Sequence, residues 1–203
     1  MLNFSDALYF RHATRHFDVN KEIPENDLKF ILDSALKAPS SLNLEHWEYV
    51  VVQDKSMKSQ LKEASFNQQQ VEDASAVVVI LAKKDTLLDP NSPEVKKLIS
   101  ERIPENGIPI AVNFLQSFPN SEAFTAWSKS QCYITASFLM MAAATLEIDS
   151  CPMEGFMNDD VLKLLNYSSD EYEVALVVPL GYRKEPTTPE KVRASLEEKV
   201  TFV

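Results

Sequence analysis

Apolar residues recur every three or four positions along several stretches of the chain, which predicts amphipathic helices. This spacing predicts one helix from about Phe4 to His12, with Asn3 as its cap. It predicts a second helix that starts near Pro24 and is closed by Pro39. Further helices are expected over residues 55–64, 92–103 and 158–165.

The longest helical stretch covers about residues 121–148. Its second half, YITASFLMMAAATL (133–146), is apolar on nearly all sides, which is typical of a core or subunit-interface helix. The run is too short and too rich in Thr and Ser to span a bilayer. Residues 104–120 are interrupted by Pro104, Pro109 and Pro119 and show no readable pattern.

Continuous apolar runs predict buried strands at EYVVV (48–52), SAVVVILA (75–82) and EVALVVPLGY (173–182). KVTFV (199–203) is a candidate terminal strand. Because strands alternate with helices, the pattern predicts an α/β or α+β fold with a mixed sheet. The chain contains no repeat or linker that would divide it, so we expect a single domain over residues 1–203.

The net charge and the cysteine pattern exclude some classes of function. The chain has 20 Lys and Arg against 30 Asp and Glu, a formal net charge of −10, which argues against nucleic-acid or anionic-membrane binding. The two cysteines, Cys132 and Cys151, form no CxxC motif, and the N-terminus lacks the pattern of a signal peptide. We therefore expect a cytoplasmic protein in a reducing compartment.

Only three glycines occur: Gly107, Gly155 and Gly181. Neither a dinucleotide fingerprint nor a P-loop can be assembled from them, since both motifs need a glycine-rich turn. A phosphate-bearing ligand would therefore have to be held mainly by Arg and Lys side chains.

The stretch RHATRHF (11–17) concentrates positive charge in an acidic chain. If the first helix continues through it, Arg11 and Arg15 share one face and His12 and His16 the adjoining one. The arginine fork suits a phosphate, although cations also favour a solvated helix C-terminus. The two histidines have metal-ligand spacing, but they lack the Glu of H-E-x-x-H and lie beside arginines, so we expect no metal site.

Three other stretches have ligand-binding character, and each also has a plain alternative. APSSLNLEHW (38–47) supplies Ser40, Ser41 and Asn43 before a strand, or simply forms a turn. CPMEGF (151–156) positions backbone N–H groups, or is only a tight turn. In an extended tail Lys191 and Arg193 point to the same side, as any surface pair could.

In this order and at this spacing, the stretches resemble the FMN-dependent nitroreductase family. The likeness is greatest to bacterial oxygen-insensitive NAD(P)H nitroreductases and dihydropteridine reductases. RHATRHF is similar to the family pattern R-[HR]-[ST]-x-[KR]-x-F, and APSSLNLEHW to A-P-S-S-x-N-x-x-P-W. DASAVVVI, CPMEGF and KVR match three further family patterns. The likeness spans most of the chain and weakens between residues 85 and 120.

The resemblance implies a three-layer α+β fold, with a central mixed, mainly antiparallel sheet flanked by helices. It also implies a homodimer with two FMN sites at the subunit interface. Arg11, Lys191 and Arg193 would meet the phosphate, and His12 and Arg15 the ribityl chain and pyrimidine edge. The remaining implied cofactor-binding residues are Ala13, Pro39, Ser40, Ser41, Asn43, Asn67, Gln70, Pro152, Met153, Glu154 and Gly155.

Within that set, Ser40, Ser41 and Asn43 would come from the other subunit, and the N–H groups of Glu154 and Gly155 would face flavin N5. Three departures from the family pattern bear on the site. Ala13 stands where a hydroxyl is usual, Gln70 where the nearest relatives have a lysine, and His46 where a proline is usual. The loss of that lysine would lower the reduction potential.

The resemblance implies an oxidoreductase that passes two electrons from NADH or NADPH through flavin N5 in a ping-pong order. The expected acceptors are nitroaromatics, quinones or similar flat electrophiles, with no catalytic side chain because the chemistry belongs to the cofactor. Phe114, Phe118 and Phe124 are candidates to line the acceptor space, or are ordinary packing residues.

Three alternatives stay open. The first is a divergent flavoenzyme for reductive dehalogenation or flavin breakdown, which a positive clamp within residues 103–125 would favour. The sequence there carries only Glu105 and Glu122 as formal charges. The second is a flavin-binding regulator or storage protein that nicotinamides fail to reduce, and the third is a scaffolding dimer without flavin.

Overall fold

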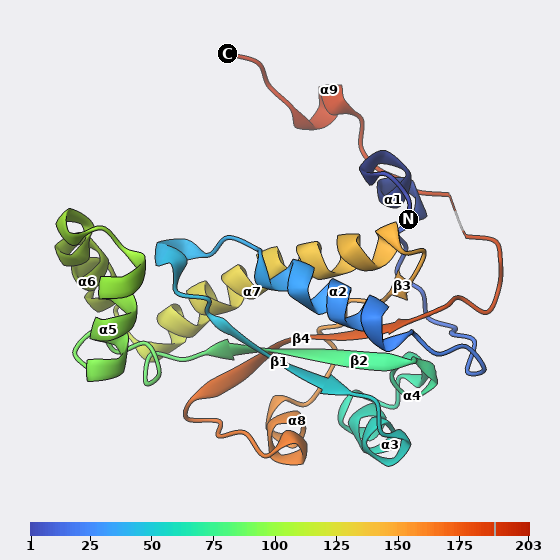
Figure 1. The fold of residues 1–203 in the computed structure, drawn as a ribbon, viewed down its shortest axis with the longest axis horizontal. Helices are drawn as coiled ribbons and strands as arrows, with labels where there is room; N and C mark the ends of the chain where they lie inside the picture. The colour runs from blue at the N-terminus through green and yellow to red at the C-terminus, as the bar shows by residue number, and fades with distance from the viewer. Residues whose placement is uncertain (189) are drawn as a thin grey trace.

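The fold is built on a four-stranded sheet, seen in a computed structural model that describes residues 1–188 and 190–203 (Figure 1). The strands are β1 (Trp47–Val52), β2 (Ala76–Lys83), β3 (Asp149–Ser150) and β4 (Tyr172–Gly181), in the order β1-β2-β4-β3. The three longer strands confirm the three apolar runs. All pairs of these named strands are antiparallel, and the parallel contact is an isolated bridge between Ala13 and Ser150.

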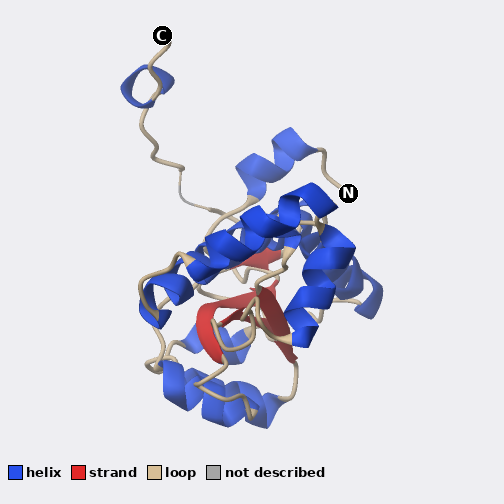
Figure 2. Ribbon diagram, turned by 90° about the vertical axis from the view of Figure 1, so that its left-hand side faces the viewer, coloured by secondary structure: helices blue, strands red, loops and turns tan. Residues whose placement is uncertain are grey.

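Helices cover both faces of the sheet (Figures 1 and 2). On one face lie α2 (Glu25–Leu36) and α7 (Ser121–Thr145). On the other lie α3 (Lys55–Ala64), α4 (Gln69–Asp73) and α8 (Asn158–Leu165). This confirms the three-layer α+β fold.

Strand β2 explains why its sequence is a continuous apolar run rather than an alternating one. Its side chains alternate between two separate cores. Val78 and Ile80 pack with the α2–α7 layer, and Val77 and Val79 pack with the layer of α3 and α8. A strand that is buried on both faces has no position for a polar side chain.

Helix α7 is the longest helix, and its apolar character has two sources. One side is core, with Cys132, Ala136 and Leu139 almost fully buried. Another side leaves Tyr133, Ile134 and Phe138 each about two-fifths exposed, at 38%, 37% and 41%. The predicted core role of this helix is confirmed. No other part of the described chain covers its exposed apolar side chains.

The region that the sequence left unreadable is helical. It contains the short turn η2 (Glu105–Gly107) and α6 (Ile108–Gln116). Just before it, α5 (Pro93–Arg102) confirms the helix expected over 92–103. In Figure 1 these helices form a lobe at one end of the sheet. Within the described residues, no helix combines the length and apolar character needed to cross a membrane.

Two expectations about the chain ends are wrong. Helix α1 (Phe4–Phe10) stops before the basic stretch, so RHATRHF is not helical and the proposed shared helical face does not exist. The terminal strand at 199–203 is also wrong. The short helix α9 (Leu196–Lys199) occupies its start, and the tail projects away from the sheet, where no strand can pair with it.

The end of β4 is packed too tightly for a side chain. A Cβ on Gly181 would lie 2.9 Å from the ring of buried Phe17 and 3.3 Å from the backbone nitrogen of Ser75. We predict that Gly181→Ala lowers the free energy of unfolding by about 1–3 kcal/mol through overpacking, measured by urea denaturation.

Gly107→Ala is the matched control, because its Cβ would meet only the methyl group Cγ2 of the Ile103 side chain, at 3.0 Å. That side chain can turn away, so the control should be nearly neutral. Equal effects of the two substitutions would contradict the overpacking argument.

Candidate functional site

The basic stretch runs as extended chain between β3 and the segment that follows β4. Ala13 forms its bridge with Ser150, and the N–H of Thr14 donates to the Ser150 carbonyl at 3.1 Å. Further along, Phe17 forms a bridge with Arg183. The basic stretch is thus held along both sides by backbone contacts, and its side chains are presented from a fixed ribbon.

A buried ion pair stands behind this ribbon. Asp149 is 2% exposed, and its two oxygens accept from Arg183 Nε at 2.9 Å and Nη2 at 2.6 Å. The same carboxylate accepts from the Thr14 hydroxyl at 3.0 Å and from the Arg183 N–H at 2.9 Å. Arg183 also lies over the Phe10 ring, 4.2 Å from its centroid. Neither Asp149 nor Arg183 belongs to a motif that would have marked it as a site residue in the sequence.

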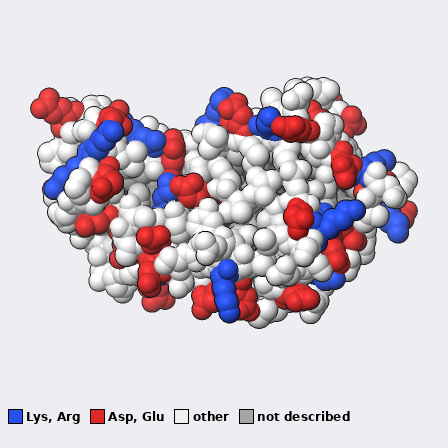
Figure 3. Space-filling view, turned by 60° about the horizontal axis from the view of Figure 1, so that its bottom comes forward, with Lys and Arg blue, Asp and Glu red and all other residues white. Residues whose placement is uncertain are grey.

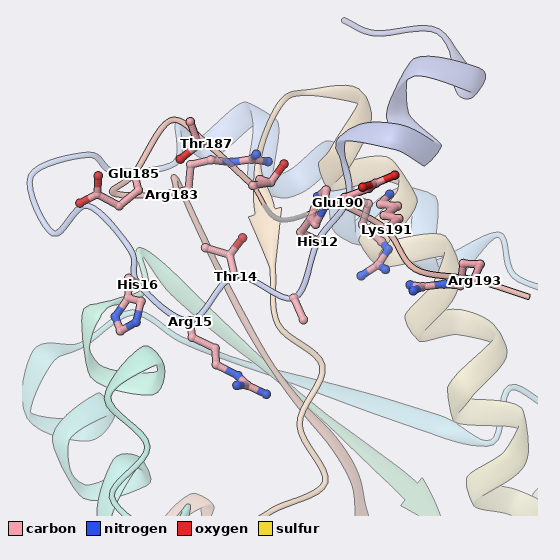
Figure 4. A pocket seen from close by; sticks show the side chains of 13 residues that line it. His12, Thr14, Arg15, His16, Arg183, Glu185, Thr187, Glu190, Lys191 and Arg193 are labelled. Carbon is pink, nitrogen blue, oxygen red and sulfur yellow. The ribbon is translucent and has the colours of Figure 1, made fainter.

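This basic ribbon (residues 11–17) and the C-terminal tail that follows β4 border a cavity of about 460 Å³ (Figure 4). Six predicted cofactor-binding residues line this one cavity, although they lie far apart in the sequence: Arg11, His12, Ala13, Arg15, Lys191 and Arg193. The lining residues that sequence reasoning missed are Thr14, His16, Arg183, Glu185, Thr187, Thr188 and Glu190.

The cavity is crowded with positive charge. Burial, followed by the nearby charges of Arg11 and Arg193, lowers the pKa of Lys191. The ammonium of Lys191 donates to the carbonyl of Leu8 at the end of α1. By contrast, the face in Figure 3 has acidic and basic side chains interspersed around its rim. Like charges held together in this way favour an anionic ligand.

A second group of predicted residues meets where the loop before α4 contacts the CPMEGF segment. Gln68 Nε2 donates to the carbonyls of Gly155 at 2.8 Å and Ser65 at 3.0 Å. Gln70 Nε2 donates to Gln68 Oε1 at 3.1 Å and contacts Met153 Sδ at 3.5 Å. A Cβ on Gly155 would lie 3.1 Å from Gln68 Nε2, so a larger residue there would press on the atom that forms the clamp.

The two groups are neighbours. Cys151 opens the CPMEGF segment, and burial raises the pKa of its thiol while the charges of Arg15 and Arg11 act in the opposite direction. Asn67 lies in the same loop as Gln68, in the left-handed region with φ 54°. The segment that carries the Gly155 turn therefore begins within reach of the charges of Arg15 and Arg11.

The third predicted group lies elsewhere. Ser41 donates its N–H to Gln131 Oε1 at 3.0 Å, Ser40 Oγ accepts from the Glu45 N–H at 2.9 Å, and the Asn43 carbonyl accepts from Arg102 at 2.9 Å. In Figure 1 this loop, which follows exposed Pro39, lies beside the α5–α6 lobe at the opposite end of the molecule from the basic ribbon. One chain does not bring Ser40, Ser41 and Asn43 to the cavity.

Comparisons with known proteins identify the family of this chain. The chain matches the sequence model of the nitroreductase family over residues 8–182. It is 34% identical over 212 aligned residues to a Staphylococcus aureus (strain USA300) protein named "Putative NAD(P)H nitroreductase", covering 98% of this chain and 94% of that protein. The chain belongs to the nitroreductase family. It is therefore an oxidoreductase.

Solved structures of nitroreductase-like proteins share the fold. The Bacillus subtilis protein ydfN superposes with a TM-score of 0.84 at 25% identity, covering 98% of each chain. An Exiguobacterium sibiricum protein solved in complex with FMN superposes with a TM-score of 0.83 at 22% identity, covering 100% of this chain and 98% of that one. At such low identity the second likeness bears on the fold alone.

In this nitroreductase-family chain the three candidate acceptor phenylalanines pack on one tryptophan. Phe114, Phe118 and Phe124 have ring centroids 5.3, 5.0 and 5.3 Å from that of Trp127. Phe124 is buried and Phe114 is 40% exposed, so of these two only the ring of Phe114 has substantial surface available for contact with a ligand. Their role in lining an acceptor space stays a prediction.

His46 is an unusual member of this aromatic cluster. It is fully buried, its ring lies edge-on to Trp127 at 4.5 Å, and neither ring nitrogen has a hydrogen-bond partner among the described residues. Burial, and then the charge of Lys83, lower the pKa of His46 from 6.5 to about 4. The imidazole is therefore neutral at pH 7 in the folded protein.

This burial predicts a pH-dependent stability. Between pH 6.5 and pH 4 His46 binds a proton in the unfolded chain but stays neutral in the folded protein, so protonation favours unfolding. The contribution of neutral His46 to the free energy of unfolding is therefore complete above about pH 6.5 and is lost as the pH falls towards 4. Between pH 7 and pH 4 the wild type should lose about 3 kcal/mol more free energy of unfolding than His46→Leu. Urea midpoints at both pH values measure this difference, and identical pH dependence of the two proteins would contradict it.

Proposed function

We propose that the protein is an FMN-dependent oxidoreductase that carries two electrons from NADH or NADPH to nitroaromatic, quinone or similar flat electrophilic acceptors in a ping-pong order. The observation that carries the proposal is the cationic cavity, where Arg11, Lys191 and Arg193 converge from the two ends of the chain. Such a cavity fits the phosphate of a mononucleotide.

The residues present suit that phosphate. The volume of about 460 Å³ lies within the usual range for small-molecule sites. Arginine binds phosphate with paired, charge-assisted hydrogen bonds, which are stronger than neutral ones. Because the chain has only three glycines and none lines the cavity, side-chain cations take the place of a glycine-rich phosphate loop.

The Gly155 turn suits the ring system of the same cofactor. Within the described residues, the N–H groups of Glu154 and Gly155 donate to no protein acceptor, while Gln68 fixes the carbonyl side of the turn. Two free donors at a rigid turn are available to an acceptor atom on a flat ligand. Arg15 lines the phosphate cavity, and its charge also acts on Cys151 at the start of the CPMEGF segment, so it would stabilise negative charge on the ring edge.

Bound FMN would supply the hydride chemistry, so no side chain need act as an acid, base or nucleophile. The chain would bind the phosphate, orient the ring and leave one face open. A single open face that serves reductant and acceptor in turn supports the ping-pong order and a broad acceptor range. The use of NADH or NADPH is supported by the name of the Staphylococcus aureus relative.

We also propose that two copies complete each site. Ser40, Ser41 and Asn43 lie far from the cavity of their own chain, so a second copy would have to bring them to it. The exposed apolar side chains of α7 offer a surface for that copy. The tail adds further exposed apolar surface, since Val192 is 85% and Phe202 87% exposed.

A cytoplasmic location is supported by two cysteines that are both free.

A mixing experiment tests the shared site. Lys191→Ala/Arg193→Ala damages the cavity, and Ser40→Ala/Asn43→Ala damages the loop. Each variant alone should weaken FMN binding roughly tenfold or more, because each loses contacts to a charged or polar ligand. After the two variants are mixed and refolded together, mixed dimers should regain one intact site. About a quarter of all sites should then bind FMN with wild-type affinity.

Lys199→Ala is the control, since Lys199 is an exposed cation on the same tail but outside the cavity. Its FMN affinity, measured by flavin fluorescence, should equal that of the wild type. Wild-type affinity in Lys191→Ala/Arg193→Ala would contradict the phosphate site. Failure of the mixture to recover any sites, with mixed dimers present, would contradict the shared site.

A further inference from the structure

We propose that Asp149 is a positioning residue for cofactor binding: it holds the start of the basic ribbon, residues 11–14, in the shape that receives the phosphate, without touching the ligand itself. The proposal rests on the proposed function, since it concerns the same cavity. It is carried by one buried carboxylate, which contacts the ribbon directly at Thr14 and, through its partner Arg183, the end of α1 at Phe10.

The first point of attachment is Thr14, whose hydroxyl donates to Asp149 Oδ1 at 3.0 Å. The second is Phe10, whose carbonyl accepts from Arg183 Nη2 at 3.3 Å while its ring stacks under the same guanidinium. Arg11 lies between these two anchors. Its direction into the cavity is therefore set at both ends by the Asp149–Arg183 pair.

The carboxylate has no capacity left for another role. Oδ1 accepts from Thr14 and from Arg183 Nη2, and Oδ2 accepts from the Nε and the backbone N–H of Arg183. At 2% exposure Asp149 is closed off from solvent and ligand. A buried pair of this kind adds little net stability compared with apolar packing, whereas its fixed geometry can specify one arrangement of the chain.

An electrostatic role and a positioning role of Asp149 predict opposite effects of its removal on phosphate binding, so the two roles can be distinguished. Asp149 places a negative charge beside an anion site, so by electrostatics alone its removal should strengthen phosphate binding. Removal would also free the charge of Arg183, which lines the cavity. If Asp149 acts by position, its removal weakens binding instead, because the ribbon loses its anchor.

The test is the dissociation constant of FMN for Asp149→Asn, which keeps the size of the side chain and removes its charge. We expect binding roughly tenfold weaker than in the wild type, the size of effect seen when supporting groups behind a binding residue are lost. Unchanged or tighter binding would overturn the proposal. A wild type that does not bind FMN would instead refute the proposed function.

Glu173→Gln is the matched control. It breaks the Lys129–Glu173 pair, which is also 2.6 Å long and joins α7 to β4 of the same sheet, but lies outside the cavity. This variant should bind FMN as the wild type does. Weakening equal to that of Asp149→Asn would show a general loss of stability and would overturn the positioning role.

A milder variant keeps the proposal testable if Asp149→Asn fails to fold. Thr14→Val removes one tether, and Thr14→Ser restores the hydroxyl. In the flavin-free protein, the backbone amide at position 14, which donates to Ser150, should exchange its hydrogen faster in Thr14→Val and at the wild-type rate in Thr14→Ser. A direct hydroxyl–ligand contact would leave this exchange unchanged, and that result would overturn the tether.

Discussion

The mutual repulsion of cations gathered in one cavity is the constraint on which the rest of the site depends. Arg11, Arg15, Lys191 and Arg193 reach it from the two ends of the chain, in a protein whose formal net charge is −10. Burial, and then the charges of Arg11 and Arg193, lower the pKa of Lys191. Such an arrangement is stable only if the backbone is held firmly and the charge is partly offset.

The fold supplies both conditions at one edge of the sheet. The last residue of β4 pairs with Asp149 in β3, so the sheet register itself brings Arg183, two residues further on, to the buried carboxylate. Glu185 and Glu190 line the same cavity and offset part of the charge. The close packing of Gly181 against Phe17 fixes the edge where these groups meet. The phosphate of a cofactor would complete the balance.

Much of the fold could be predicted because its signals are local. The strand over β2 and the helix over α3 follow from apolar runs and helical spacing within their own residues. Helix α6 was hidden because Pro109 suggested a break, although a proline in the first turn of a helix costs no hydrogen bond. The terminal strand was expected from an apolar run, but a strand needs a neighbour, and the tail of a single chain has none.

The site was predictable in part, for a similar reason. Arg11 and Arg15 stand out as charges in a short stretch, whereas Asp149 is an ordinary acid in the sequence and gains its role only from the burial and pairing that the sheet creates. The clamp of Gln68 on Gly155 joins residues 87 positions apart and has no local signal. Long-range contacts of this kind need the folded chain before they can be read.

The measurement that tests the account most directly is the visible absorbance spectrum of the protein reconstituted with FMN, recorded before and after NADH or NADPH is added without oxygen. We expect bound flavin absorbance that bleaches with at least one nicotinamide. A protein that takes up no FMN would contradict the cofactor site. Bound flavin that neither nicotinamide bleaches would contradict the reductase and favour a flavin-binding regulator.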